Sequence, residues 1–445
     1  MPLQKNQVLT LRVERLSSDG SGVAHSPDGE AVFIPGAAPG DEARVRIVKD
    51  CKRYAFGILD EVLTPSPDRI PVDCAVAGPC GGCSLRHLDY AAELRAKQEN
   101  VADAFARIGG LDVPVLPIVG SPEVNRYRNK VQFPVGVDKS GKPCIGFYAG
   151  RTHRIVPCPD CRLQPGVLNE IGNALCAFFA EKGIQPYSEE TGRGLVRHIF
   201  LRRGAHSGQI MVCLVCTRAK LPSAEELCTR LKAQFAEITT ILLNVNAKNT
   251  NVILGTETHT LYGPGYIEDT LCGVPVQLAA EQLYGIAAQY AQLTPDDLLL
   301  DLYCGMGTIG LSMAAHCREL IGVEIVPEAI ESAKANAARM GTDVAAKSRF
   351  FCADAGQAAT RLAAEGLHPD IVMLDPPRKG CDEATLSAVV RMSPRRVVYV
   401  SCNPATAARD AAWLEQNGYH AEKVQPVDLF PRTRHCECVL SFSKV

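Results

Sequence analysis

The C-terminal part of the chain alternates short apolar runs with helical stretches from about residue 286 onward. Strands that alternate with helices are typical of a parallel sheet covered by helices. The first run, residues 298–302, leads into the glycine-rich stretch Tyr303–Gly310 and then into a predicted helix. A strand, a glycine-rich turn and a helix in this order let a ligand approach the backbone and the helix N-terminus. This pattern predicts an α/β domain that binds a nucleotide-like cofactor.

Acidic residues mark three successive strands of the predicted sheet. Glu324 ends the second strand, 23 residues after Asp301, a distance that suits a carboxylate binding ribose hydroxyls. Asp354 ends the third strand, where it is placed to meet an adenine amine. The turn also has the Gly-x-Gly-x-x-Gly spacing of dinucleotide sites, so a dinucleotide is one alternative and a turn without ligand is another. The acids favour S-adenosylmethionine.

Two further strands end in residues whose side chains suit binding or reaction with a substrate. Residues 370–374 lead into Asp-Pro-Pro-Arg-Lys-Gly, and Arg378 stands where methylases of exocyclic amines carry an aromatic residue. The next strand, residues 397–400, ends in Ser-Cys-Asn-Pro. Cys402 therefore lies at the carboxyl end of a parallel strand, where such sheets bind ligands. The alternative is a buried structural cysteine.

A cysteine at this place suits methylation of pyrimidine carbon 5, which is too electron-poor to attack a methyl group unaided. A thiolate that adds to carbon 6 makes carbon 5 enolate-like, and a base later removes its proton. Glu437 is the acid of a predicted last strand with mostly apolar neighbours, a setting that raises a carboxyl pKa. The alternative for Glu437 is a strand acid that faces solvent.

These motifs, in this order, resemble those of the RNA uracil-5-methyltransferase family, and a Pro-x-Thr-x-His-x-Glu motif ends at Glu437. The resemblance covers nearly the whole chain. It implies a class I, Rossmann-like methyltransferase domain with Cys402 as nucleophile and Glu437 as base. The residues expected to bind the cofactor are Asp301, Tyr303, Gly305, Gly307, Glu324, Asp354 and Asp375.

The chain is predicted to have several domains. Residues 1–62 contain short strand candidates punctuated by Gly and Pro, which favours a small β-barrel, and the resemblance implies an OB-like, RNA-binding TRAM domain. Residues 63–275 are expected to form an α+β central domain with the cysteine cluster and an RNA-binding surface. Residues 276–445 are expected to form the methyltransferase domain.

Three of the nineteen cysteines, Cys74, Cys80 and Cys83, lie close together in a glycine-containing segment. Four thiolates can hold zinc or an iron–sulfur cluster, and the spacing alone slightly favours zinc. Either Cys158 or Cys161 can supply the fourth sulfur. The family resemblance instead implies a 4Fe–4S cluster with Cys161 as its fourth ligand.

The net charge of −2 excludes a polycation, so RNA binding requires local basic surfaces. Residues 123–162 hold eight Lys or Arg against three acids, and residues 193–203 hold four Arg and no acid. Both windows contain motifs that resemble the family's central domain. The candidate RNA contacts are Arg126, Arg128, Lys130, Arg197 and His198.

One segment departs from the family pattern. The stretch before Leu278 is shorter than in family members, which carry a glutamine there, and Gln277 cannot be assigned to the position of that glutamine. A catalytically impaired RNA-binding protein and a methylase of cytosine or of transfer RNA therefore stay as alternatives. The cluster cysteines, by resemblance, favour 23S ribosomal RNA. With neither a signal peptide nor a membrane-spanning run in the sequence, we expect a cytoplasmic monomer.

Overall fold

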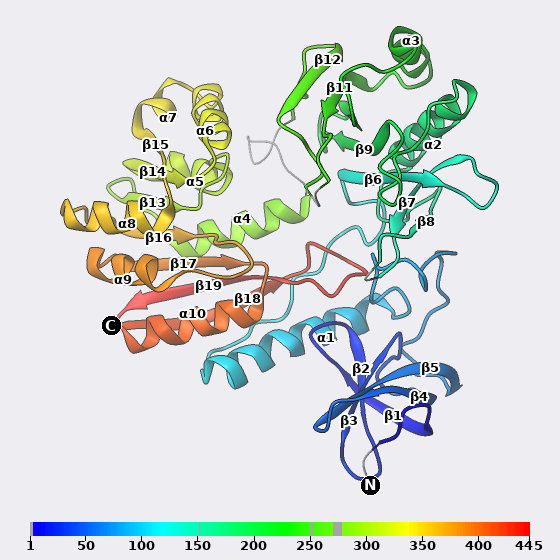
Figure 1. Ribbon diagram of the computed structural model, residues 1–445. Helices are drawn as coiled ribbons and strands as arrows, with labels where there is room; N and C mark the ends of the chain where they lie inside the picture. The colour runs from blue at the N-terminus through cyan, green and yellow to red at the C-terminus, as the bar shows by residue number, and fades with distance from the viewer. Residues whose placement is uncertain (1–2, 151, 250–251, 270–277) are drawn as a thin grey trace.

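The computed structural model describes residues 3–150, 152–249, 252–269 and 278–445; of residues 278–280 it describes the backbone alone. These ranges form a small barrel, a central mixed sheet and a larger C-terminal sheet (Figure 1). The predicted fold class, a small β-barrel, an α+β centre and a C-terminal α/β sheet, is confirmed. No helix in the described part of the chain is long and apolar enough to cross a membrane.

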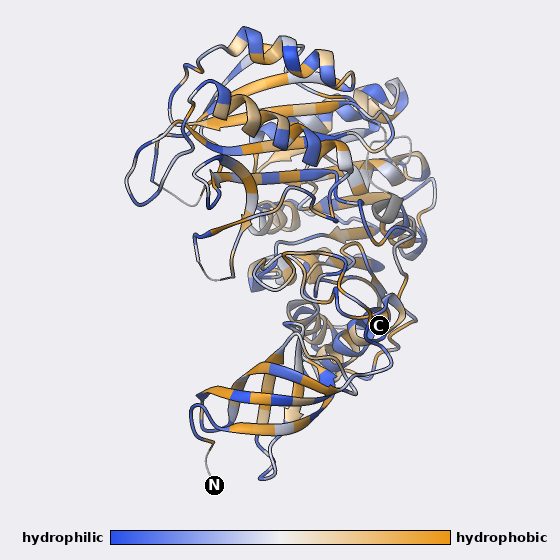
Figure 2. Ribbon diagram, turned by 90° about the vertical axis from the view of Figure 1, so that its right-hand side faces the viewer, coloured by the Kyte–Doolittle hydropathy of each residue, from blue (hydrophilic) through white to orange (hydrophobic). Residues whose placement is uncertain are grey.

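The N-terminal barrel is closed, with strand order β1-β2-β3-β5-β4. Its strands are β1 Val8–Leu16, β2 Ser21–His25, β3 Ala31–Pro35, β4 Glu42–Asp50 and β5 Tyr54–Thr64. Because side chains alternate along each strand, hydrophobic and hydrophilic residues also alternate (Figure 2). Val32, Ile34, Val45 and Ile47 are completely buried inside the barrel.

The central region has a seven-stranded sheet of order β12-β11-β10-β9-β6-β7-β8, with helices packed on it. Its elements are β6 Lys130–Val137, β7 Pro143–Tyr148, β8 Ile155–Pro157, α2 Gly166–Glu181, β9 Val196–Arg203, β10 Ile210–Cys216, α3 Ala224–Gln234, β11 Ile238–Val245 and β12 Glu257–Tyr262.

The C-terminal sheet also has seven strands, in the order β15-β14-β13-β16-β17-β19-β18. The first five are parallel, and β19 runs antiparallel to both β17 and β18. Its strands are β13 Leu298–Leu302, β14 Glu319–Glu324, β15 Ser348–Cys352, β16 Ile371–Leu374, β17 Arg396–Ser401, β18 Tyr419–Val427 and β19 Glu437–Lys444.

Helices follow the parallel strands and cover the sheet. They are α4 Leu278–Ala291, α5 Thr308–Met313, α6 Pro327–Arg339, α7 Thr342–Lys347, α8 Ala355–Ala364, α9 Glu383–Met392 and α10 Pro404–Gln416, with a 3₁₀ turn at Ala314–His316. Strands β13 and β16 are buried along their whole length, which explains why their residues are apolar apart from Asp301.

A helix from the segment before the central sheet joins this C-terminal part. Helix α1, Tyr90–Asp103, continues as a π-helix, Ala104–Gly109, and Phe105 packs into the hydrophobic core of the C-terminal sheet. The chain then runs beside β18, with bridges from Val115 and Val119. In space, this part of residues 63–275 therefore lies with the C-terminal sheet, and the domain boundaries stay a prediction.

Candidate active site

The glycine-rich turn after β13 is held by a buried carboxylate. Tyr303, Gly305 and Gly307 all have positive φ angles, the last at 79°. Asp301 Oδ2 accepts the N–H of Gly310 at 3.0 Å. A Cβ at Gly310 would lie 2.7 Å from that same oxygen, so only glycine lets the turn close on the strand. Asp301 therefore shapes the turn from within.

Glu324 ends β14 beside this turn, and both of its oxygens accept backbone hydrogen bonds. Oε2 accepts from Gly305 N at 3.1 Å, and Oε1 accepts from Ile325 N at 2.9 Å and Val326 N at 3.0 Å. The carboxylate is thus fixed at the carboxyl end of its strand. Oε2, which accepts a single N–H, keeps acceptor capacity for a hydroxyl group of a ligand.

Two more acids follow neighbouring strands. Asp354 follows β15 and caps α8 by accepting the N–H of Gln357 at 3.1 Å. Burial raises the pKa of Asp375, which follows β16, to about 7. Burial also raises the pKa of Asp301 to about 8, with repulsion from Asp375 and Glu324 adding to the rise. The edge of the sheet is therefore rich in carboxyl groups that a cation would stabilise in the charged form.

Tyr303, by contrast, directs its hydroxyl toward α9, where it lies 3.4 Å from Thr385 Oγ1. The ring therefore closes the turn against α9. Gln277 and the short stretch before Leu278 lie outside the described residues, so the predicted departure from the family pattern stays a prediction.

The strand register brings Cys402 and Glu437 together. Strands β17 and β19 are antiparallel, and Ser401 stands opposite Cys438. The next pair in that register is Cys402 and Glu437, whose side chains point to the same face. Burial raises the pKa of Glu437 to about 8, with Asp375 adding to the rise and Arg378 opposing it. A thiol and a carboxyl thus share one end of the sheet.

Arg378 completes this group. In the sequence it served only as an argument against methylation of an exocyclic amine. Its backbone carbonyl accepts hydrogen bonds from Asn403 Nδ2 at 3.0 Å and Thr406 Oγ1 at 3.3 Å, which attach its loop to the start of α10. Burial raises the pKa of the Cys402 thiol and Glu437 adds to the rise, whereas the Arg378 guanidinium, hydrogen-bonded to the sulfur, opposes it.

Cys402 opens into a cavity of about 920 Å³ between the C-terminal sheet, α1 and the barrel. Four residues on the outer face of the barrel stand side by side on the paired strands β1, β2, β3 and β5. They form a row of Arg15, Val23, Phe33 and Phe56. The first three of these line the cavity. Phe33, Phe56 and the exposed Tyr54 form an aromatic cluster with ring centroids 5.6–5.9 Å apart.

The predicted cysteine ligands also meet in space. Cys74, Cys80 and Cys83 from one loop and Cys158 and Cys161 from another line a common cavity of about 50 Å³. Nevertheless, within the described ranges no three His, Cys, Asp or Glu residues are arranged so that they could hold a metal ion. The sulfur atoms converge without adopting a metal-ligand geometry.

Polar groups favour a thiolate at Cys161, whereas at Cys80 and Cys83 burial outweighs them and raises the pKa. The Cys158 thiol and the backbone N–H groups of Leu163 and Gln164 donate to Cys161, and together they lower its pKa to about 6. The Arg86 guanidinium bonds to Cys83 and is itself fixed by Asp73 at 2.7 Å. Such donors are the surroundings in which cysteines bind metals or clusters as thiolates.

The five candidate RNA contacts have different surroundings. Arg126 pairs with Asp160 at 2.6 Å and donates to two carbonyls of the Cys161 loop, and Arg128 lines the cysteine cavity. Lys130 is exposed at the start of β6. Arg197 is buried and donates to the carbonyls of Asn246 and Lys248, and His198 is buried with its pKa lowered to about 4. Contact with RNA stays a prediction for all five.

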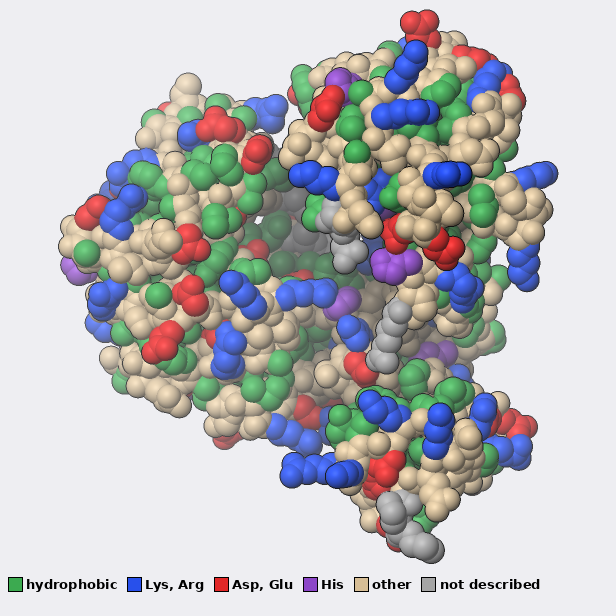
Figure 3. All heavy atoms as spheres, in the orientation of Figure 1, with side chains coloured by type: hydrophobic (Ala, Val, Ile, Leu, Met, Phe, Trp, Pro, Cys, Tyr) green, Lys and Arg blue, Asp and Glu red, His purple; other side chains and the backbone are tan. Residues whose placement is uncertain are grey.

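The face between the three parts of the molecule is hollowed, and Lys and Arg side chains gather around the hollow (Figure 3). The net charge of −2 for the whole chain gives no indication of this local concentration of positive charge. A hollow of this kind, with a thiol and a carboxyl at the sheet edge, suits a polyanionic substrate that must present one group deep inside the protein.

Comparison with known proteins gives concordant results along the chain. Residues 266–445 match the family model described as tRNA (Uracil-5-)-methyltransferase, and residues 2–59 match that of the TRAM domain. A protein of Halalkalibacterium halodurans described as an uncharacterized RNA methyltransferase is 42% identical, over 98% of this chain and 97% of its own. One from Bacillus cereus with the same description is 40% identical over 100% of this chain and 98% of its own.

Among solved structures, the chain is similar to Pyrococcus abyssi tRNA (uracil-54, C5)-methyltransferase in complex with S-adenosyl-L-homocysteine. The two share 25% sequence identity and superpose with a TM-score of 0.75, over 98% of this chain and 100% of the other. The likeness therefore includes the barrel and the central sheet as well as the C-terminal sheet.

Proposed function

The chain belongs to the RNA uracil-5-methyltransferase family and is an RNA methyltransferase with a fold that binds S-adenosylmethionine, and we propose that it methylates carbon 5 of a uridine in structured RNA. The observation that carries the proposal is the register that sets Cys402 opposite Glu437 at the carboxyl end of β17. We further propose that the protein acts on 23S ribosomal RNA, in the cytoplasm and as a monomer.

The chemistry assigns one step to each residue. The Cys402 thiolate adds to carbon 6 of the uracil, and carbon 5 gains enolate character. S-adenosylmethionine, when bound, supplies the methyl group that carbon 5 takes. The Glu437 carboxylate then accepts the remaining proton of carbon 5. The electron pair of that C–H bond forms the carbon 5–carbon 6 double bond and expels the Cys402 thiolate.

The acid-rich edge fits the cofactor. We assign Glu324 to the ribose hydroxyls, Asp354 to the adenine amine and Asp375 to the reacting end, while Gly305 and Gly307 let the ligand approach the backbone. Asp301 holds the turn, and the Tyr303 ring borders it. The sulfonium and ammonium groups of S-adenosylmethionine are cations, so they oppose the burial and the mutual repulsion that raise the pKa of Asp301.

The function can be tested by methyl transfer from labelled S-adenosylmethionine. Transcripts of 23S ribosomal RNA and of transfer RNA are offered separately, and the product is digested to nucleosides. We expect label in 5-methyluridine from the ribosomal transcript. Label in transfer RNA would instead support the second candidate, which the full-length likeness to a transfer RNA methyltransferase favours. Label in 5-methylcytidine, or none, would contradict the proposed function.

The row of Arg15, Val23, Phe33 and Phe56 on the barrel, with its two aromatic rings, supports a path for the RNA toward Cys402. Unpaired bases stack on aromatic side chains at about 1–3 kcal/mol per base. A Phe33→Ala, Phe56→Ala double variant is therefore expected to raise the KM for RNA at least about tenfold, with kcat within about twofold. Ile58→Ala, which removes an exposed apolar side chain of β5 outside the row, is the matched control. An unchanged KM in the double variant would refute this path.

We also propose that Cys74, Cys80, Cys83 and Cys161 hold a 4Fe–4S cluster, since their sulfur atoms line one cavity with hydrogen-bond donors around it. Protein purified without oxygen is expected to contain about four irons and sulfides per chain. Cys161→Ser should lose them, and Cys158→Ser should keep them. Stoichiometric zinc without sulfide would replace the cluster by a four-thiolate zinc site, and iron retained by Cys161→Ser would exclude Cys161 as ligand.

The cluster would join the loop of Cys74, Cys80 and Cys83 to the loop of Cys161, and it would therefore be structural. The proposed domain division, at residues 62/63 and 275/276, places this site in the central domain. Methyl transfer to an enolate is redox-neutral, so the reaction itself has no need of electrons from the cluster.

A further inference from the structure

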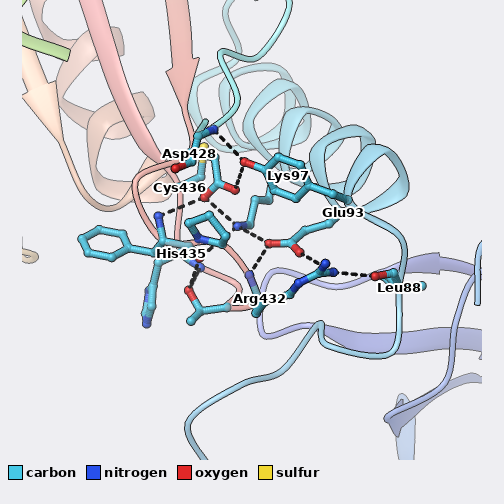
Figure 4. A network of polar contacts seen from close by, with 12 residues as sticks. Leu88, Glu93, Lys97, Asp428, Arg432, His435 and Cys436 are labelled. Atoms are coloured by element: carbon cyan, nitrogen blue, oxygen red, sulfur yellow. Dashed lines mark hydrogen bonds and ion pairs between the residues drawn. The ribbon is translucent and has the colours of Figure 1, made fainter. Parts of the chain in front are cut away.

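Four buried charged side chains connect α1 with the loop that precedes Glu437. Lys97 Nζ lies 2.7 Å from Glu93 Oε1 and 2.8 Å from Asp428 Oδ1, and at most 1% of each of these side chains is exposed. Arg432 NH1 lies 3.6 Å from Glu93 Oε2. Figure 4 shows Lys97 and Glu93 of α1 pointing toward Asp428 and Arg432 of the loop. Two cations and two anions thus balance within one buried group.

The charged side chains bind the backbone of residues 428–436, which we call the base loop because it leads directly to Glu437. Lys97 Nζ donates to the carbonyl of Phe430 at 3.2 Å, and Asp428 Oδ1 accepts the N–H of Phe430 at 3.0 Å. Glu93 Oε1 accepts the N–H of Arg432 at 2.7 Å. Helix α1 therefore holds the base loop at two backbone groups, the carbonyl of Phe430 and the N–H of Arg432.

The far end of Arg432 extends this attachment to the segment before α1. Its guanidinium donates to the carbonyl of Leu88 at 2.7 Å, and its own carbonyl accepts the N–H of Leu85 at 3.1 Å. Tyr90 adds a further contact, because its hydroxyl donates to Asp428 Oδ2 at 2.9 Å.

Short-range contacts carry this position on to Glu437. Thr433 Oγ1 donates to the carbonyl of Phe430 at 2.8 Å and accepts the N–H of His435 at 3.3 Å. The rings of Phe430 and His435 meet edge to face at 6.3 Å. Because Glu437 is the first residue of β19, the place of its carboxyl group depends on how the base loop enters the strand.

Cys402 is positioned independently of the base loop. It follows β17 directly and precedes α10, whose first turn is capped by Asn403. A displacement of the base loop would therefore move the base while leaving the nucleophile in place. Displacements of about 1 Å in a catalytic group reduce rates by as much as about 100-fold.

We propose that Lys97, Glu93, Asp428 and Arg432 form a clamp that positions Glu437 for removal of the carbon 5 proton. Lys97 is the central positioning residue of this clamp, because it joins both carboxylates to the Phe430 carbonyl. Buried ion pairs contribute little net stability compared with apolar packing, whereas they can select one arrangement of the chain. The inference rests on the proposed role of Glu437 as base.

The test is Lys97→Met, which keeps the length of the side chain and removes its charge and hydrogen bonds. We expect kcat to fall about 10- to 100-fold. With ordinary RNA, a methylated and still covalent RNA–protein adduct should accumulate, since proton removal is the step that slows. With RNA that carries 5-fluorouridine, the rate of adduct formation should stay within about twofold of the unmodified protein, because that reaction ends before any proton is removed.

Two further variants keep the test decisive. Arg396→Met breaks the 2.7 Å ion pair with Glu422 at the other end of β17 and should produce no methylated adduct. Tyr90→Phe removes the hydroxyl that donates to Asp428 and accepts the N–H of Ser121, and it should give a smaller effect of the same kind. It takes the place of Lys97→Met if that variant does not fold. If Lys97→Met and Tyr90→Phe lose thermal stability but, like Arg396→Met, accumulate no methylated RNA–protein adduct, the clamp is refuted.

The result separates this inference from the proposed function. If Glu437→Gln accumulates the methylated adduct but the clamp variants do not, Glu437 remains the base and the clamp is refuted. If Glu437→Gln itself releases product normally, the assignment of the base fails, and the clamp fails with it.

Discussion

A Cys402→Ala variant is expected to lose all methylation of RNA while it still binds S-adenosylmethionine. Only the thiolate can add to carbon 6, and without that addition carbon 5 is too electron-poor to take a methyl group. RNA with 5-fluorouridine at the target should trap the unmodified protein covalently, because fluorine cannot leave as a cation. The covalent complex should be absent with Cys402→Ala on a denaturing gel.

The pH dependence of trapping checks the same residue. Burial and Glu437 raise the pKa of the Cys402 thiol above its usual value, so the thiolate fraction, and with it the trapping rate, should increase with pH across the neutral range. Cys352→Ala, which changes an exposed cysteine of the same sheet, should trap normally. An adduct formed by Cys402→Ala would assign the nucleophile to another residue.

Glu437→Gln is expected to stop the reaction one step later. Glutamine occupies the same space but cannot accept the carbon 5 proton, so addition and methyl transfer proceed and the thiolate cannot leave. Turnover should fall about 10²- to 10⁴-fold, the usual contribution of a positioned base. A denaturing gel should show labelled methyl groups in a stable RNA–protein complex.

Ionisation of Glu437 sets the pH at which the unmodified protein releases product. Its pKa is raised to about 8, so the carboxylate is the minor form at pH 7 and becomes the major form above pH 8. The rate of proton removal should therefore rise as pH increases through 8. Glu422→Gln, on the neighbouring strand β18, is the matched control. Free 5-methyluridine released by Glu437→Gln at the normal rate would exclude this residue as the base.

Local patterns were enough to predict the α/β sheet and the acids at its edge. The middle parts of β13 and β14 are apolar because parallel strands are buried on both faces, and the glycine-rich turn follows β13. Parallel strands end at one edge, so Asp301, Glu324 and Asp354 could be placed together without knowing the strand order.

Side-chain environment could not be predicted in the same way. Charge windows made Arg197 and His198 candidate RNA contacts, but they gave no sign that both side chains are buried and that Arg197 donates to backbone carbonyls. The count of basic residues along a sequence carries no information about which of them find partners within the protein. The structure likewise assigned Arg126 a partner in Asp160.

The proposed chemistry follows from local sequence, since a cysteine that ends one strand and a glutamate that begins another can be recognised without the fold. Their position opposite each other depends on tertiary structure, because β19 inserts antiparallel between β17 and β18. Tertiary structure also decided that Lys97 meets Asp428, 331 residues away in sequence. Periodicity depends on neighbours within a few residues, whereas strand insertion and a buried charge pair arise when distant elements pack together and each buried charge needs a partner.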